Sequence, residues 1–140
     1  MTILAFIGIQ LQGTLYNYYY VILRNKSVGG DTTSKIFQNK SPKALPGETQ
    51  KSVDILFLTY TIVYGAFDKI IHTVDKDAYK VKTFPNWFMT LVSIYGLGFQ
   101  LLIMAIMLSI NLIDYIIPFF VLYTALIFVI IGIRKVFFKV

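Results

Sequence analysis

A stripe of polar and ionisable residues in the second apolar segment could carry protons or cations. Asp54, Thr61, Asp68 and Asp75 are spaced by seven, and His72 follows Asp68 by four positions. On one continuous helix, this spacing places them on a single face. Ionisable groups at membrane depth are costly and usually serve an ion or proton pathway. The alternative, which we favour because only Thr61 clearly falls at membrane depth, is that Asp54 caps the helix while the other groups lie in headgroups or water.

A further acid precedes the last apolar segment. Asp114 lies four positions before Pro118, so the proline leaves the Asp114 carbonyl without its helical amide partner, which predicts a kink. A kink beside an acid can form a gate or an ion site, whereas near a helix start it is more often a bend repaired locally. The residues that we assign to a candidate ion or proton face are therefore Asp54, Asp68, His72 and Asp114.

A second polar stripe lies on the first apolar segment. Gln10, Gly13, Thr14 and Asn17 repeat at helical spacing, and an amide in lipid gains about 1 kcal/mol from a partner on a neighbouring helix. Small and polar residues in the third segment likewise favour close packing. We therefore predict helix–helix polar contacts at Gln10, Thr14, Asn17, Thr61, Ser93 and Gln100. The alternative for the first stripe is a ligand or quinone pocket lined by Gln10, Asn17 and the tyrosines at 18–20.

The residue types exclude most catalytic and metal chemistry. The chain has no cysteine and one histidine, which rules out disulfides, thiolate metal sites and sites built from several histidines. It carries no glycine-rich phosphate loop and no Ser-His-Asp set. We therefore assign no catalytic residue and no metal ligand, and expect no cofactor, only bound phospholipid.

The composition indicates which environment must hold these residues in place. Hydrophobic residues make up 56% of the 140-residue chain and charged residues 14%. A small soluble domain cannot bury that much apolar surface, because a large share of its residues lies at the surface. We therefore predict an all-α integral membrane protein. The net charge of +6 then suits anionic headgroups better than nucleic acid.

Apolar segments predict one domain, residues 1–140, built as a bundle of four transmembrane helices at about 3–23, 53–71, 86–110 and 112–133. A long polar loop, 25–51, joins the first two helices, and a connector, 72–85, joins the second and third. A tight turn with Asn111 as N-cap makes the last two helices an antiparallel hairpin. The first helix is expected to be retained, because neither a basic region nor a cleavage site flanks it.

The basic residues leave the orientation of such a bundle open. Four spans place both termini and the connector on one side, with seven basic residues, and the first loop on the other side, with six. Basic residues beside apolar segments and an interfacial tryptophan predict headgroup contacts at Arg24, Lys26, Trp87, Arg134 and Lys135. The lack of a secretory signal favours an organelle inner membrane, such as the mitochondrial one, although a retained first helix suits the endoplasmic reticulum equally.

The segment Gln50-Lys51-Ser52-Val53-Asp54 resembles the start of the second helix in the membrane-bound glutathione and eicosanoid enzyme superfamily, which places an amide and an acid at this spacing. The chain size, the four predicted helices and the basic first loop are also similar to that family. The resemblance implies a small oligomeric enzyme that grips glutathione with arginines projecting from its helices. Here the arginines are Arg24 and Arg134, at predicted helix ends, and the family's proline in the second helix is absent.

Three functions remain open from the sequence. We favour a non-catalytic structural or accessory subunit of a larger membrane complex, such as an energy-transducing one, whose partners are other membrane subunits and lipids. Aromatic residues, 16% of the chain, and the polar stripes suit wide contact surfaces, and nothing is arranged for chemistry. The alternatives are the glutathione-type enzyme and a small oligomeric channel or transporter, in which Asp54, Thr61 and Asp68 would line an aqueous path.

Overall fold

The computed structural model describes residues 1–28, 41–81 and 83–138, with the backbone alone for residues 25–28. These residues form six α-helices and two short 3₁₀ helices, and no strand lies among them. The elements are α1 (Thr2–Val28), α2 (Gln50–Val63), α3 (Gly65–Val74), η1 (Lys76–Lys80), α4 (Asn86–Ser93), α5 (Leu97–Ser109), η2 (Ile113–Tyr115) and α6 (Ile116–Phe137). The predicted all-helical class is confirmed.

The predicted bundle of four transmembrane helices is not confirmed. Within the described residues, only Ile113–Phe137 is a single helix long and apolar enough to cross a membrane. Two of the predicted spans are broken, with a bend of 44° between α2 and α3 and of 46° between α4 and α5; each pair adds a span only if it crosses as a unit. α1 is not among the candidate spans, because its glutamines, asparagine and tyrosines lower its hydropathy.

Two tyrosines hold the break between α4 and α5. Tyr95 lies buried in the break, and its hydroxyl donates to the Tyr123 carbonyl on α6 at 3.0 Å. The Tyr123 hydroxyl donates in return to the Ile94 carbonyl at 3.1 Å. An interrupted helix leaves carbonyls without amide partners, and such groups need a substitute away from water. These two hydrogen bonds to α6 therefore stabilise the break between α4 and α5.

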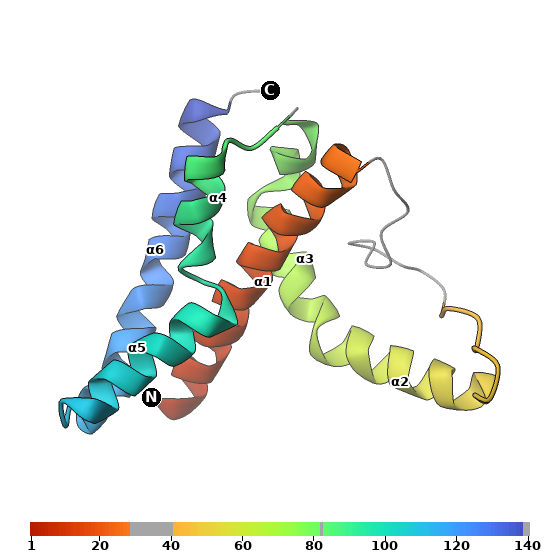
Figure 1. The fold of residues 1–140 in the computed structure, drawn as a ribbon, viewed down its shortest axis with the longest axis horizontal. Helices are drawn as coiled ribbons and strands as arrows, with labels where there is room; N and C mark the ends of the chain where they lie inside the picture. The colour runs from red at the N-terminus through yellow and green to blue at the C-terminus, as the bar shows by residue number, and fades with distance from the viewer. Residues whose placement is uncertain (29–40, 82, 139–140) are drawn as a thin grey trace.

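α1 is the central helix, and its buried face follows alternating three- and four-residue steps. Ala5, Gly8, Gln12, Leu15, Tyr19 and Ile22 are buried along its length. Such spacing keeps one stripe of a helix against its neighbours. Figure 1 shows α1 running diagonally across the molecule, with α6, α4 and α5 on one side and α3 on the other. α3, α4 and α6 are therefore organised around α1.

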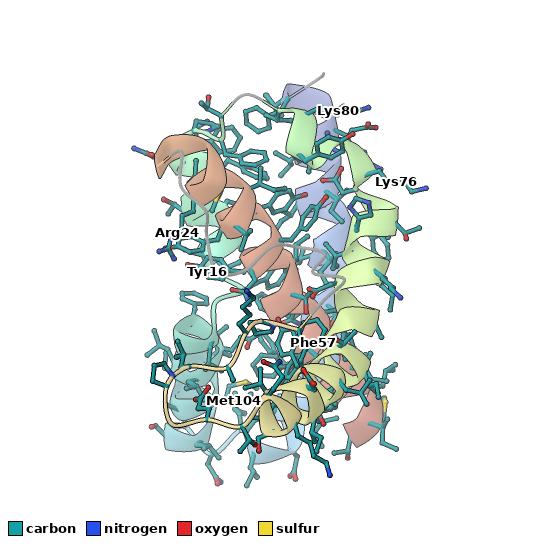
Figure 2. All side chains as sticks on the ribbon, turned by 90° about the vertical axis from the view of Figure 1, so that its right-hand side faces the viewer. Tyr16, Arg24, Phe57, Lys76, Lys80 and Met104 are labelled. Atoms are coloured by element: carbon teal, nitrogen blue, oxygen red, sulfur yellow. The ribbon has the colours of Figure 1, made fainter. Side chains whose placement is uncertain are left out.

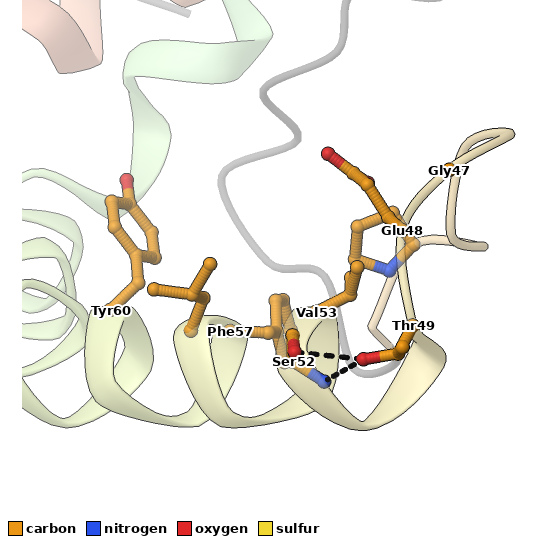
Figure 3. Close-up of a pocket in the computed structure, with 9 residues that line it drawn as sticks. Gly47, Glu48, Thr49, Ser52, Val53, Phe57 and Tyr60 are labelled. Carbon is orange, nitrogen blue, oxygen red and sulfur yellow. Dashed lines mark hydrogen bonds between the residues drawn. The ribbon is translucent and has the colours of Figure 1, made fainter.

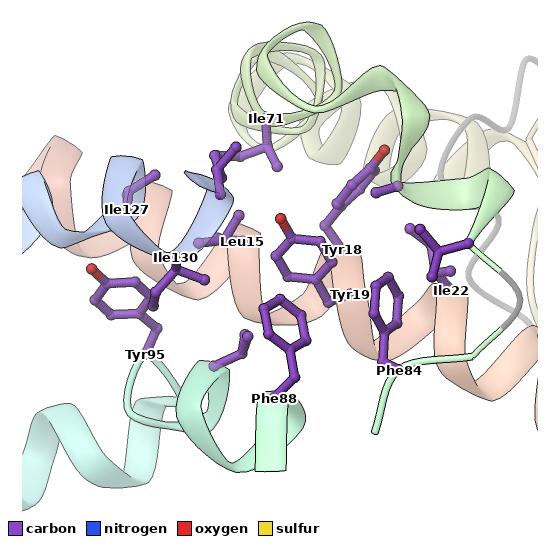
Figure 4. Packing of buried hydrophobic residues seen from close by; sticks show 14 residues of the cluster. Leu15, Tyr18, Tyr19, Ile22, Ile71, Phe84, Phe88, Tyr95, Ile127 and Ile130 are labelled. Atoms are coloured by element: carbon purple, nitrogen blue, oxygen red, sulfur yellow. The ribbon is translucent and has the colours of Figure 1, made fainter. Parts of the chain in front are cut away.

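Aromatic rings form the core around the second half of α1. The Tyr19 ring packs edge-on against Phe84 and Phe88, with centroids 5.4 and 5.3 Å apart. Aliphatic side chains from other helices, including Ile71 and Ile130, complete the cluster (Figure 4). Edge-to-face contacts of this kind add to the area buried. This core fixes the C-terminal half of α1 against α3, α4 and α6.

The direction of α1 differs from the predicted alternation of spans. Gln12 bonds to Thr124, and Tyr19 and Arg134 both bond to Asp75, so α1 runs parallel to α6. The ends of α1, α3 and α6 therefore lie at one end of the molecule, here called the basic end (Figure 1). Four alternating spans would place the end of the first helix opposite the connector, and the two termini on one side. The structure instead places the termini at opposite ends (Figure 1).

α2 projects away from the other helices. Its N-cap is Thr49, whose hydroxyl accepts a hydrogen bond from the Ser52 amide, and the helix contains no buried residue. Figure 1 shows its first turn far from the basic end, at the level of the N-terminus and α5. α2 is therefore an arm that is joined to the bundle through α3.

Candidate functional site

Among the described residues, the buried charged side chains are Asp75 and Arg134, which form an ion pair at the basic end. The side chains of Asp75 and Arg134 are 0% and 4% exposed. Arg134 Nε donates to Asp75 Oδ2 at 2.8 Å, and its Nη2 pairs with Oδ1. The Tyr19 hydroxyl donates to the same Oδ2 at 2.7 Å. Buried charges persist when they are paired and hydrogen-bonded in this manner.

Each partner comes from the end or the buried face of a different helix. Asp75 is the residue that directly follows α3, and Arg134 lies in the last turn of α6. The Tyr18 hydroxyl on α1 donates to the Asp75 backbone carbonyl at 2.9 Å and lies 3.4 Å from His72 Nδ1. One acid thus ties α1, α3 and α6 together.

The structure corrects the expectation for Arg134. This residue was expected among the lipid headgroups, but it is buried and bound to Asp75. Asp75, which was expected in headgroups or water, supplies the counter-ion that allows the burial. With its guanidinium enclosed, Arg134 is not placed to grip an external anion such as glutathione.

A second polar network crosses the bundle between α1, α5 and α6. Gln12 is buried, and its amide Nε2 donates to Thr124 Oγ1 at 2.9 Å. Gln100, also buried, donates to Gln12 Oε1 at 2.9 Å. Gly8 lies directly against Thr124, since a Cβ at this position would collide with the Thr124 hydroxyl. Both amides are therefore paired across helices, as polar groups in an apolar interior need to be.

Of the six residues predicted to make polar contacts between helices, Gln100 lies in this network. The hydroxyls of Thr14, Thr61 and Ser93 donate to carbonyls of their own helices, at 2.8, 2.8 and 2.7 Å. Gln10 is half-buried and supplies the carbonyl for Thr14, and Asn17 is exposed. The stripe of α1 that faces the other helices is instead the one that contains Gln12 and Tyr19.

The structure does not assemble the candidate ion or proton face. Asp54 is exposed on α2, where it accepts from the Gln50 amide at 2.8 Å, whereas Asp68 and His72 are half-buried on α3. The bend of 44° between these helices interrupts the expected continuous stripe. Asp114 lies exposed in η2, at the far end of α6. No group of acids and histidine suited to a metal ion occurs among residues 1–28, 41–81 and 83–138.

The remaining predicted headgroup residues lie at the basic end. Arg24 is exposed near the end of α1, and Trp87 is 52% exposed in the first turn of α4. Lys135 donates to the Val74 carbonyl at 3.0 Å and is exposed. Lys26 lies in the last turn of α1, and its side chain is outside the described part of the chain.

An open groove lies on the arm, away from all of these groups. It encloses about 610 Å³ between α2 and the turn that precedes it. Figure 3 shows Glu48, Thr49 and Ser52 near one end of the groove, with Phe57 and Tyr60 further along α2. A groove with an apolar wall and a polar end suits an amphipathic partner.

Searches against protein-family models, curated proteins and solved structures find no match to this chain.

Proposed function

We propose that the protein is a non-catalytic subunit of a larger membrane assembly, and that α2 is its contact with a neighbouring subunit. The observation that carries the proposal is the arm itself, a helix of 14 residues without a buried side chain. Leu56, Leu58, Tyr60 and Ile62 are exposed around its circumference. Exposed apolar side chains gathered on one stretch of the surface mark a site that protein or lipid covers.

The engaged polar groups fit a structural role. Asp75 and Arg134 hold helix ends together, and Gln12 and Gln100 hold helix faces together. These contacts use the interior polar groups to fix the helices around α1. An energy-transducing complex of an organelle inner membrane is the setting that the sequence analysis favours for such a subunit.

The proposal is tested by native electrophoresis of the full chain, extracted from its own membrane in mild detergent. The arm variant combines Leu56→Ser and Ile62→Ser, at positions 70% and 67% exposed. A matched control combines Leu122→Ser and Val129→Ser on α6, where both residues are also exposed. We expect the wild-type and control chains to migrate in one large complex, and the arm variant to leave it while keeping its helical circular dichroism.

Two results would contradict the proposal. If the wild-type chain migrates only as a small homo-oligomer, it is not a subunit of a larger assembly. An arm variant that stays in the complex as firmly as the control would show that α2 is not the contact.

A further inference from the structure

One face of α1 is turned away from the other helices and carries polar side chains. Gln10, Gly13 and Asn17 follow one another in steps of three and four residues, which places them on one side of a helix. Phe6 and Tyr20 continue the same side toward the two ends of α1. Phe6, Asn17 and Tyr20 are exposed, and Gln10 and Gly13 are half-buried. These five residues are here called the outer face of α1.

The described helices leave the outer face of α1 open. Figure 2 shows α1 crossing the near side of the bundle, with Tyr16 on its left. The contacts of α2 are mainly with α3, and Phe6 stays exposed. At Gly13, a Cβ built on the backbone would have no atom within 4 Å. A further helix therefore has room to pack on this face.

The two amide side chains of the outer face have no hydrogen-bond partner in the described part of the chain. Gln10 gives its backbone carbonyl to the Thr14 hydroxyl, but no group bonds to its side-chain amide. The same holds for the side-chain amide of Asn17. In contrast, the buried amide of Gln12 is bonded to both α5 and α6. The outer face thus keeps hydrogen-bonding groups that the fold does not use.

The packing of α1 on α6 sets the membrane depth of these amides. Gln12 donates to Thr124, which lies near the middle of the candidate span Ile113–Phe137. At 1.5 Å per residue, Gln10 and Asn17 lie within about 8 Å of Gln12 along the helix axis. With α6 across the membrane, both amides lie within the hydrocarbon, where an unpaired polar group is costly. A partner that supplies donors and acceptors at the same depth removes this cost.

A second copy of the chain is complementary to this face. Copies in one membrane share one orientation, so a two-fold axis along the membrane normal places α1 parallel to α1 and equal residues at equal depth. A carboxamide carries both donors and an acceptor, so each amide can pair with its own equivalent. Asparagine in the seam of a parallel helix pair fixes the register and the number of helices. Asn17 and Gln10 are thus suited to a symmetric pair.

We propose that two copies of the chain pair through the outer face of α1. The two Gln10 side chains bond to each other, and so do the two Asn17 side chains, with Gly13 between them. Phe6 and Tyr20 pack at the two ends of this contact and exclude lipid from the amides. The contact is separate from the one proposed on α2, so the larger assembly contains the chain as a pair.

Cysteine cross-linking of the full chain in its own membrane tests which face of α1 meets the second copy. The chain has no cysteine, so Phe6→Cys and Tyr20→Cys each introduce one thiol. Oxidation with copper phenanthroline should convert both variants to disulfide-linked dimers. The matched control is Leu4→Cys, which is also exposed but lies on another side of α1, and it should stay monomeric. Equal cross-linking of Leu4→Cys and Phe6→Cys would overturn the proposal.

The role of the amides is tested by analytical ultracentrifugation of the purified chain in detergent micelles. Asn17→Leu should raise the dissociation constant of the dimer about tenfold, the effect of one hydrogen-bonded pair between membrane helices. Its helical circular dichroism should not change, because Asn17 is exposed. The control Ser109→Ala removes an exposed hydroxyl that bonds within α5 and should leave the dissociation constant unchanged. A monomeric wild type, or an unchanged dissociation constant for Asn17→Leu, would overturn the proposal.

Discussion

Asp75 and Arg134 show how a few residues set the position of three helix ends. The Asp75 carboxylate receives hydrogen bonds from Arg134 and Tyr19, and its carbonyl receives one from Tyr18. We expect Arg134→Met to lower the free energy of unfolding by about 3–5 kcal/mol, because the change leaves a buried carboxylate without its counter-ion. Denaturant- or heat-induced unfolding in detergent micelles, followed by circular dichroism, measures this loss.

The double change Asp75→Leu with Arg134→Met provides the control for that prediction. Replacing both charges by apolar groups removes the desolvation cost together with the attraction, so most of the stability should return. Asp77→Asn, which breaks an exposed pair with Lys80, should leave the free energy of unfolding close to that of the wild type, because solvent screens exposed ion pairs. Equal losses for Arg134→Met and Asp77→Asn would contradict the buried-pair interpretation.

At the residue scale, the sequence identifies polar groups better than it identifies their partners. Gln100 was selected because an amide in an apolar helix needs a partner, and it bonds to Gln12. Gln12 was missed because the neighbouring stripe of Gln10, Thr14 and Asn17 is richer in polar residues. The spacing that runs through Gln12 and Tyr19 was the available signal, since it follows the buried face of α1.

At the element scale, the close packing of α1 against α6 depends on Gly8. A Cβ at Gly8 would collide with Thr124 Oγ1, the atom that receives the Gln12 amide. We therefore expect Gly8→Ala to lower the free energy of unfolding by about 1–3 kcal/mol, as overpacking does in other interiors. The same micelle unfolding experiment measures the change.

Gly13→Ala is the matched control on the same helix. No atom lies within 4 Å of a Cβ built at Gly13, so alanine should be neutral or stabilising there. Adding Thr124→Ala to Gly8→Ala should cost less than the sum of the two single changes, since both act on one contact. If Gly8→Ala and Gly13→Ala behave alike, the close approach of α1 and α6 is wrong.

The turn between α5 and α6 illustrates how a boundary signal can be assigned to the wrong helix. Asn111 was expected to cap the start of the last helix, but it ends α5 with a positive φ of 59°. The Leu112 amide donates to the Met107 carbonyl at 2.8 Å, and the Asn111 amide donates to Leu108 at 3.1 Å, which closes α5 as a Schellman motif. Asparagine suits both roles, so the residue type alone does not separate them.

This turn gives a further prediction at the element scale. Asn111→Val should cost about 1–2 kcal/mol, because a β-branched residue is strained in the left-handed region. Asn111→Gly should be tolerated, because glycine adopts a positive φ without strain. Thermal unfolding of the two variants in one detergent gives the comparison, and equal midpoints would contradict the left-handed turn.

At the scale of the whole molecule, composition predicts helices and an apolar surface, whereas the order and direction of the helices depend on contacts distant in sequence. The breaks at 94–96 and at Tyr64 lie inside apolar segments that read as continuous, and Tyr123, far along the chain, holds one of them. The parallel packing of α1 with α6 rests on Gln12–Thr124 and on the Asp75 cluster. A rule of alternating spans contains no information about these pairs.

The direction of α1 makes a prediction about which residues share a side of the membrane. In the structure, Arg24 and Lys76 lie at the basic end, and Asn111 lies at the other end. Four alternating spans would instead place Arg24 and Asn111 on the same side of the membrane, opposite Lys76. The chain has no cysteine, so Arg24→Cys, Lys76→Cys and Asn111→Cys each introduce a unique thiol.

We expect a membrane-impermeant maleimide to label positions 24 and 76 from one side of sealed vesicles and position 111 from the opposite side. Since Lys and Arg concentrate at the basic end, that side should be the cytoplasmic or matrix face. Joint labelling of positions 24 and 111, with position 76 protected, would restore the alternating four-span arrangement and reject the parallel packing of α1 with α6.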